Sequence, residues 1–209
     1  MLPSDDPRGQ AVIDIAARLF AAFGHDGTSL HDIAEASGED MTWLQQRFGD
    51  KRELYLTVVD HGSRMERGIV TDVLSALPAA DPEEARAVVY RLATRFLEFF
   101  LANPQVPSLW AHRWLGDAAD IPELEATYKD PVIHLVCDAL RSAVEAGLID
   151  DRVNLEQTVQ TLIWSVYGFM HGEINTDGHG SASTDPQARQ AFLAHIQQLV
   201  DRMLTPRGA

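Results

Sequence analysis

The chain has 209 residues, and 45% of them are hydrophobic, which is enough to bury a sizeable core. Its 17 basic and 31 acidic residues give a formal net charge of −14, which argues against a nonspecific nucleic-acid coat or an anionic membrane surface as the main partner. The N-terminus does not resemble a signal peptide, no apolar run could span a membrane, and the single cysteine, Cys137, excludes an intrachain disulfide, so we expect a cytoplasmic protein.

Helical periodicity runs through almost the whole chain. Apolar residues spaced by three and four predict a first helix over residues 8–24, which Gly24 ends. Ser29, with Asp32 three residues later, predicts the start of a short second helix, and Asp40 that of a third. Six longer segments follow, over residues 51–77, 82–102, 108–118, 122–146, 155–174 and from 186 onward. With no convincing strand or repeat, the pattern predicts an all-α protein of about nine helices, with a kink at Pro131.

The first 55 residues contain the segment Asp26–Gly38, with Thr28-Ser29, Ile33-Ala34 and Gly38, followed in register by Leu44, Phe48 and Lys51. This motif resembles that of the TetR family of transcriptional regulators. The resemblance implies a helix-turn-helix DNA-binding domain over residues 1–55 and a ligand-binding and dimerisation domain over residues 56–209. It further implies a repressor, not an enzyme, that a small apolar effector releases from operator double-stranded DNA.

The resemblance also indicates which side chains contact DNA. In a helix-turn-helix, the second helix enters the major groove, and glutamine and arginine read base edges there. The expected DNA-contacting residues are Thr28, Ser29, Met41, Thr42, Trp43, Gln45, Gln46, Arg47 and Lys51, with Thr28 and Lys51 on phosphates. However, Gln45 replaces the usual tyrosine, and residues 1–55 hold five basic against ten acidic residues. The alternative is a ligand- or protein-binding dimer that has lost DNA binding.

Aromatic and polar residues of the C-terminal helices are candidates for an effector pocket, because such pockets combine apolar walls with a few polar groups. The candidates are Phe96, Phe100, Trp110, Arg113, Trp114, His134, Trp164, Tyr167 and His171. An ion pair between Arg113 and Asp117, four residues apart on one helix, is the simpler interpretation of that arginine.

The last two helices are predicted to form a homodimer interface, since each carries an apolar stripe. The interface candidates are Leu162, Val166, Phe192, Ile196, Leu199 and Met203; the same stripes could instead face the core of their own chain. We predict no cofactor and no metal: the spacing of His171, Glu173, Asp177 and His179 fits no standard zinc or calcium site. Catalytic motifs are also lacking in the sequence, so an enzyme is the weaker hypothesis.

Overall fold

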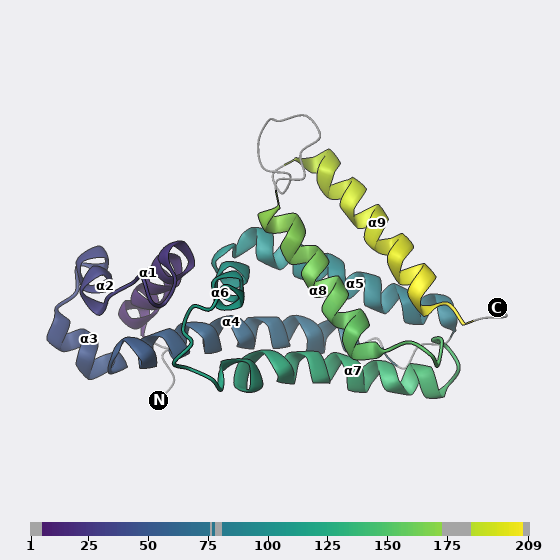
Figure 1. Ribbon diagram of the computed structural model, residues 1–209, viewed down its shortest axis with the longest axis horizontal. Coiled ribbons are helices and arrows are strands. Elements are labelled where there is room, and N and C mark those ends of the chain that lie inside the picture. Colours follow the sequence, from purple (N-terminus) through teal and green to yellow (C-terminus); the bar gives the residue numbers. More distant parts are fainter. Residues whose placement is uncertain (1–5, 76, 78–80, 173–184, 207–209) are drawn as a thin grey trace. The chain divides into compact units, whose positions relative to one another are not determined.

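The computed structural model describes residues 6–75, 77, 81–172 and 185–206. Within these ranges the chain forms nine α-helices, one π-helical turn and no strand, which confirms the predicted all-α class (Figure 1). The elements are α1 (Pro7–Phe23), α2 (Leu30–Ser37), α3 (Met41–Phe48), α4 (Lys51–Leu74), α5 (Pro82–Ala102), α6 (Gln105–Trp114), η2 (Glu125–Lys129), α7 (Asp130–Glu145), α8 (Leu155–His171) and α9 (Pro186–Leu204). In the described part of the chain, no helix combines the length and apolarity that a membrane crossing requires.

Local capping residues set the ends of the N-terminal helices where the sequence predicts them. The Ser29 hydroxyl accepts a hydrogen bond from the Asp32 backbone N–H at 3.1 Å, and the Asp32 carboxylate accepts one from the Ser29 N–H at 2.8 Å. This reciprocal pair satisfies backbone donors that the first turn of α2 leaves free. Gly38, with a φ of 69°, then ends α2 in the left-handed conformation that glycine adopts without a steric penalty.

Two predicted helices differ from those observed because proline acts differently at a helix start than in its interior. Helix α6 begins at Gln105, so Pro107 lies in its first turn, where its missing N–H costs nothing. Pro131 likewise lies in the first turn of α7 and introduces no kink within a long helix. The predicted single helix over 122–146 is therefore wrong: η2 precedes a separate α7 that begins at Asp130.

The chain divides into two compact units, and the division falls within α4. The N-terminal unit comprises residues 1–65 and 103–128, and the C-terminal unit comprises residues 66–102 and 129–209. In the N-terminal unit α6 packs against α1, and the His112 Nε2 atom lies 3.0 Å from the Ala21 carbonyl oxygen. The compact N-terminal unit thus includes α6, while a functional boundary at residue 55 stays a prediction.

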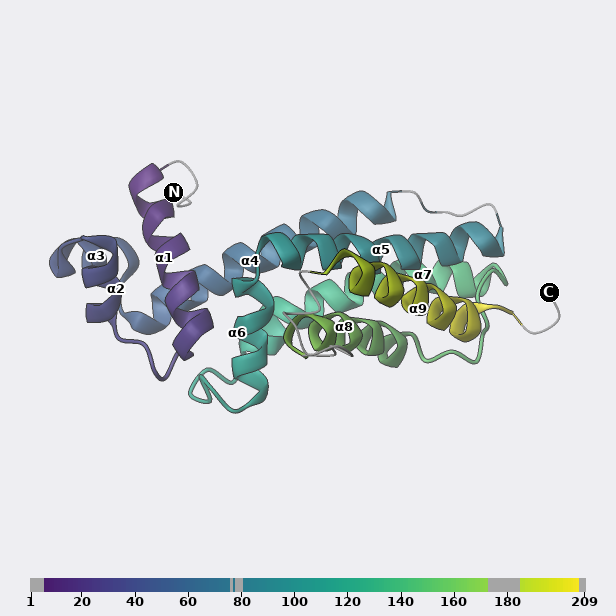
Figure 2. The same ribbon diagram turned by 90° about the horizontal axis from the view of Figure 1, so that it is seen from above.

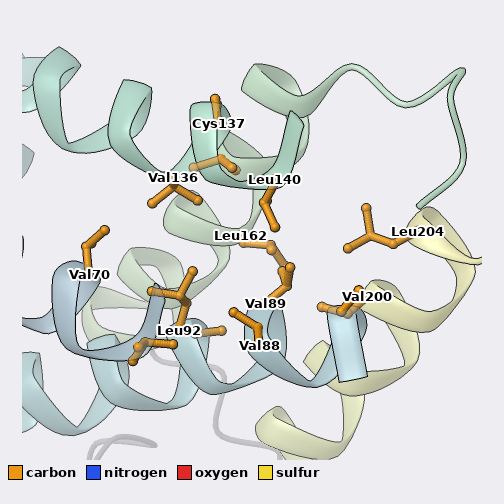
Figure 3. Close-up of a cluster of buried hydrophobic side chains, with 14 of the residues drawn as sticks. Val70, Val88, Val89, Leu92, Val136, Cys137, Leu140, Leu162, Val200 and Leu204 are labelled. Carbon is orange, nitrogen blue, oxygen red and sulfur yellow. The ribbon is translucent and has the colours of Figure 1, made fainter. Parts of the chain in front are cut away.

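The C-terminal unit is a bundle in which α8 packs against α5, α7 and α9, and α9 also packs against α5 (Figures 1 and 2). Its core consists of aliphatic side chains from every helix of the unit. Figure 3 shows Val70, Val88, Leu140, Leu162 and Leu204 among the buried side chains that gather there. Burial of this apolar surface is the main force that holds the bundle together.

Candidate DNA-contacting face and ligand cavity

Helix α3 presents a polar face to solvent and an apolar face to the N-terminal unit. The Asp40 carboxylate caps its start by accepting hydrogen bonds from the backbone N–H groups of Thr42 and Trp43, at 2.8 and 3.2 Å. Leu44 and Phe48, one turn apart, are buried and hold the helix in place. The predicted base-reading residues Thr42, Gln45 and Gln46 are exposed, whereas Met41, Trp43 and Arg47 are half-buried.

Arg8 of α1 is a cation beside α3 that the sequence pattern did not single out. Its Nε atom donates to the Glu39 carboxylate at 2.9 Å, and a second guanidinium nitrogen pairs with the same group. The guanidinium also lies 3.9 Å from the centre of the Trp43 ring, a cation–π contact. The hydrogen bond from Arg8 holds the pKa of Glu39 below its usual range. Glu39 therefore neutralises the cation nearest the start of α3.

Arg47, at the end of α3, is likewise paired with an acidic residue. Its Nε atom lies 3.5 Å from an Asp6 carboxylate oxygen, and its guanidinium lies over the Phe48 ring. Arg8 and Arg47, the two arginines beside the exposed face of α3, thus each form an ion pair with a carboxylate of the same unit.

The structure places the two predicted phosphate-contacting residues in internal bonds. Thr28 is only 3% exposed, and its hydroxyl donates to the Gly24 carbonyl at 2.7 Å, so a phosphate contact from this side chain does not fit the structure. Lys51 is half-buried, and its Nζ atom donates to the His25 carbonyl at 2.8 Å. Ser29 is exposed, but its hydroxyl serves the cap of α2.

An apolar cavity of about 50 Å³ lies in the C-terminal unit, between α5, α7 and α8. One water molecule needs about 10–15 Å³ in this measure, so the space is larger than a void for a single water. Its walls consist of Val89, Leu92, Ala93, Phe96, Phe100, Val132, Ile133, Val136, Val159, Leu162, Ile163 and Val166. Of the predicted pocket residues, Phe96 and Phe100 line this cavity, because α5 turns both rings inward.

Three predicted pocket residues belong instead to the N-terminal unit. Trp110 is buried there, and Trp114 is 44% exposed. The Arg113 guanidinium forms two hydrogen bonds with the Glu125 carboxylate, at 2.7 and 3.0 Å, and donates to the Ala118 carbonyl. It does not form the predicted ion pair with Asp117, whose carboxylate accepts backbone hydrogen bonds from the loop after α1. Arg113 thus fixes the loop that follows α6.

Three further candidates lie on the surface of the C-terminal unit. His134 on α7 and His171 on α8 are exposed, and Trp164 on α8 is 53% exposed. None of the three is part of the cavity wall. Residue type alone does not show which face of a helix is buried. The sequence therefore could not distinguish these three surface residues from residues that line the cavity.

Two buried polar residues, Glu66 on α4 and Tyr167 on α8, belong to the C-terminal unit, and neither is part of the cavity wall. Glu66 is 6% exposed and Tyr167 is 4% exposed. The Tyr167 ring stacks on Phe100, with 5.1 Å between ring centres. Burial raises the pKa of Glu66 to about 8, although the positive charge of Lys129 acts in the opposite direction. Burial, with the charge of Glu66, also raises the pKa of Tyr167.

The sequence did contain a signal for Glu66. Residues 66, 70 and 73 follow the helical spacing of four and three, and Val70 and Val73 are buried. A glutamate in line with two buried valines is therefore expected to point inward.

All six predicted dimer-interface residues pack in, or against, the core of their own chain. Leu162 and Val166 line the cavity, and Ile196 has no exposed surface. Phe192, Leu199 and Met203 are half-buried and pack against the same core. The two apolar stripes thus pack α8 and α9 onto the bundle of their own chain, which is the alternative that the sequence left open. The outward face of α8 carries Thr161, Trp164 and Gly168 instead.

One group in the N-terminal unit could hold a metal ion by its residue types. The ligand atoms of His25, Asp26 and Asp120 lie within 4.8 Å of one another, and the His25 Nδ1 atom is 3.0 Å from an Asp26 oxygen. A hydrogen bond between His25 and Asp26 accounts for this contact, so the geometry does not require an ion. Glu173, Asp177 and His179, considered above as ligands, lie outside the described residues.

Comparison with known proteins identifies the fold. No protein-family model matches the chain, and no curated protein matches it by sequence. Many solved structures match over nearly the whole chain, and the fold is that of TetR-family transcriptional regulators.

Three of these structures illustrate the match. PfmR, a TetR-family regulator from Thermus thermophilus, is 20% identical, with a TM-score of 0.63 and 90% of this chain and 92% of that chain covered. The ketosteroid transcriptional regulator KstR2 of Mycobacterium tuberculosis is 16% identical, with a TM-score of 0.67 and 96% of both chains covered. FadR from Bacillus subtilis in complex with stearoyl-CoA is 10% identical, with a TM-score of 0.71 and coverages of 91% and 96%.

Proposed function

We propose that the protein is a dimeric, DNA-binding transcriptional repressor whose affinity for its operator falls when a small apolar effector occupies the cavity of the C-terminal unit. The observation that carries this proposal is that a chain of TetR-regulator fold has both an exposed polar face on α3 and an apolar cavity in its C-terminal unit.

In this proposal, Thr42, Gln45 and Gln46 read base edges in the major groove. A glutamine side chain can form two hydrogen bonds with adenine, and the threonine methyl can contact that of thymine. All three side chains are exposed, so they can approach DNA without rearrangement of the unit.

Phosphate contacts come from Arg8 and Arg47, which must exchange their carboxylate partners for phosphate oxygens. Glu39 and Asp6 therefore compete with DNA for the two cations. A phosphate contact from Lys51 similarly requires loss of its bond to the His25 carbonyl. This competition predicts modest affinity and a shallow salt dependence, because few counterions are released on binding.

The effector acts in this proposal by binding the DNA-competent and DNA-free states with different affinities. The cavity wall is wholly apolar side chains, which favours a mainly hydrocarbon ligand. The solved neighbours include a regulator in complex with stearoyl-CoA, which carries a long acyl chain, and a ketosteroid regulator.

Dimerisation is proposed to use the outward face of α8 around Trp164. A tryptophan that is 53% exposed gives a partner a large apolar surface. Gly168, one turn further along α8, carries no side chain and faces open space, so a partner can approach the helix closely there. Two copies related by a twofold axis would then place two α3 helices on two half-sites of an operator.

The direct test is selection of genomic fragments by the purified chain at low salt, followed by retardation of the selected fragments. Gln46→Ala should change base preference at one position of each half-site, with a loss of about 1–3 kcal/mol for a lost bidentate contact. Gln187→Ala, an exposed glutamine on α9, is the matched control and should bind as the wild type does.

The alternative is a dimer of the same fold that binds a ligand or a protein but not DNA. The excess of acidic residues in residues 1–55 and the carboxylate partners of Arg8 and Arg47 favour it. If the chain enriches no genomic fragment even at low salt, and Glu39→Gln does not restore binding, this alternative replaces the repressor.

A further inference from the structure

Arg189, near the start of α9, is a half-buried cation without an anionic partner. Its Nε atom is buried and has no hydrogen-bond acceptor, and no hydrogen bond or ion pair engages its guanidinium group within the described ranges. By contrast, Arg47, Arg86 and Arg113, which are also half-buried, each form an ion pair with a carboxylate. A cation that is partly withdrawn from water without an acceptor is costly, so Arg189 is expected to serve an anion from outside the chain.

Two carboxylates on the same stretch of α5 and α9 have other partners. Asp185, one turn before Arg189, caps α9 by accepting a hydrogen bond from the Gln187 backbone N–H at 2.9 Å. Glu98 of α5 accepts a hydrogen bond from the Arg95 guanidinium at 3.3 Å. Neither carboxylate is paired with Arg189, whose positive charge therefore stays uncompensated in the structure.

Arg189 lies in the wall of a groove of about 490 Å³ between α5 and α9, two helices that pack against each other (Figures 1 and 2). Part of the wall is apolar: Leu97 is only 2% exposed, and Leu193 is half-buried. The ring of Tyr90, also half-buried, belongs to the same wall. The groove thus combines an apolar strip with an uncompensated cation, and this combination suits a ligand that has both an apolar and an anionic part.

The groove is separate from the cavity that we assign to the effector. Helix α5 contributes Phe96 and Phe100 to the cavity and Thr94, Leu97 and Leu101 to the groove, so the two spaces lie on different faces of this helix. No residue lines both spaces. A ligand in the groove is therefore a second ligand, distinct from the proposed effector.

We propose that this groove binds an amphipathic monocarboxylate, whose carboxylate pairs with Arg189 while its hydrocarbon chain lies along Leu97 and Leu193 towards Tyr90. A guanidinium group matches a carboxylate with two parallel hydrogen bonds. The Arg189 side chain has no internal hydrogen bond to lose within the described part of the chain, so it can turn to present its Nε edge to the ligand.

The surroundings of Arg189 favour a single negative charge. A doubly charged head group would exceed the one available positive charge, and Glu98 in the groove wall would repel the excess. A cationic amphiphile would be repelled by Arg189 itself. A monocarboxylate compensates the charge of Arg189 and leaves none over.

The length of the apolar strip limits the length of the chain. Arg189 and Gln197, which both line the groove, are eight residues apart on α9, or about 12 Å at 1.5 Å per residue. An extended chain advances about 1.2 Å per bond, so about ten carbons fill this length. Beyond Tyr90 and Gln197 the space between α5 and α9 is bordered by the ion pair of Arg86 with Asp201, which does not favour hydrocarbon.

The test is calorimetric titration of the full chain at pH 7 with four ten-carbon probes: decanoate, decanol, decylamine and decyl phosphate, each below its micelle concentration. We expect decanoate to bind about tenfold more tightly than decanol, because only decanoate forms charged hydrogen bonds with Arg189. Added sodium chloride should weaken decanoate binding by screening this pair, whereas decanol binding should not weaken.

Two pairs of variants locate the site. Arg189→Gln should weaken decanoate binding about tenfold and leave decanol binding unchanged, whereas Arg202→Gln, at an exposed arginine of α9 outside the groove wall, should bind both as the wild type does. Ala194→Phe places a ring in the groove and should weaken both ligands. Ala191→Phe, at an exposed alanine outside the wall, is its matched control and should weaken neither.

Four results would overturn the proposed site: equal binding of decanoate and decanol, decanoate binding that persists in both Arg189→Gln and Ala194→Phe, tighter binding of decylamine or decyl phosphate, or self-association that Ala194→Phe abolishes. The last result would assign the groove to a second copy of the chain. The titrations do not involve DNA, so their failure leaves the proposed repressor standing, and a chain that enriches no genomic fragment can still bind decanoate in the groove.

Discussion

Replacement of Glu66 by glutamine should stabilise the protein, and the gain should depend on pH. An unfolded glutamate ionises with a pKa near 4.5, whereas burial raises the pKa of Glu66 in the folded protein to about 8. Between these values the folded state holds a proton that the unfolded state has released. The free energy of unfolding of the wild type therefore falls as the pH rises through this window, by about 1.4 kcal/mol per pH unit.

The magnitude follows from the same values. At pH 7 the wild type has lost about 3 kcal/mol relative to acid solution, and above pH 8 the loss levels off near 5 kcal/mol. Glutamine has nearly the same shape and does not ionise, so Glu66→Gln should avoid this loss. The variant should thus exceed the wild type by a margin that widens from pH 5 to pH 8 and is constant thereafter.

Urea unfolding followed by circular dichroism, at fixed protein concentration and pH 6, 7, 8 and 9, measures this margin. Glu145→Gln, at an exposed glutamate of α7, is the matched control and should give a curve parallel to that of the wild type. Parallel curves for Glu66→Gln and the wild type would refute the reasoning, because they would mean that Glu66 ionises as freely in the folded protein as in the unfolded chain.

Three further perturbations test the other sites. Glu39→Gln should release Arg8 to a phosphate and steepen the slope of log K against log salt by about 0.9 per head, measured by fluorescence anisotropy; an unchanged slope contradicts the competition between Glu39 and DNA. Trp164→Glu should convert the proposed dimer to a folded monomer in sedimentation velocity, and a dimer that persists in this variant would exclude this face of α8 as the interface. Asp40→Ala removes the cap of α3 and should lower the free energy of unfolding by about 0.5–2 kcal/mol in thermal or urea denaturation; no loss would mean that the cap contributes little.

The sequence by itself determined the all-α class and the short helices of the N-terminal motif. Periodic apolar residues and caps such as Ser29 and Asp40 act within one or two turns of chain, so their effect can be recognised without the fold. The exposed face of α3 followed from the same local pattern, because Leu44 and Phe48 fix which side is buried and leave Gln45 outside.

The tertiary structure alone decided which side chains meet. Arg8 and Glu39 are 31 residues apart in the chain, and no local rule pairs them. Arg113 was expected in the ligand pocket, but packing of α6 against α1 assigns it to the N-terminal unit. Glu66 and Tyr167 come from helices about 100 residues apart, and their ionisation depends on how much water the packed bundle excludes around them. Charge pairing and desolvation are properties of the assembled fold, because they depend on distances between segments that the local sequence does not encode.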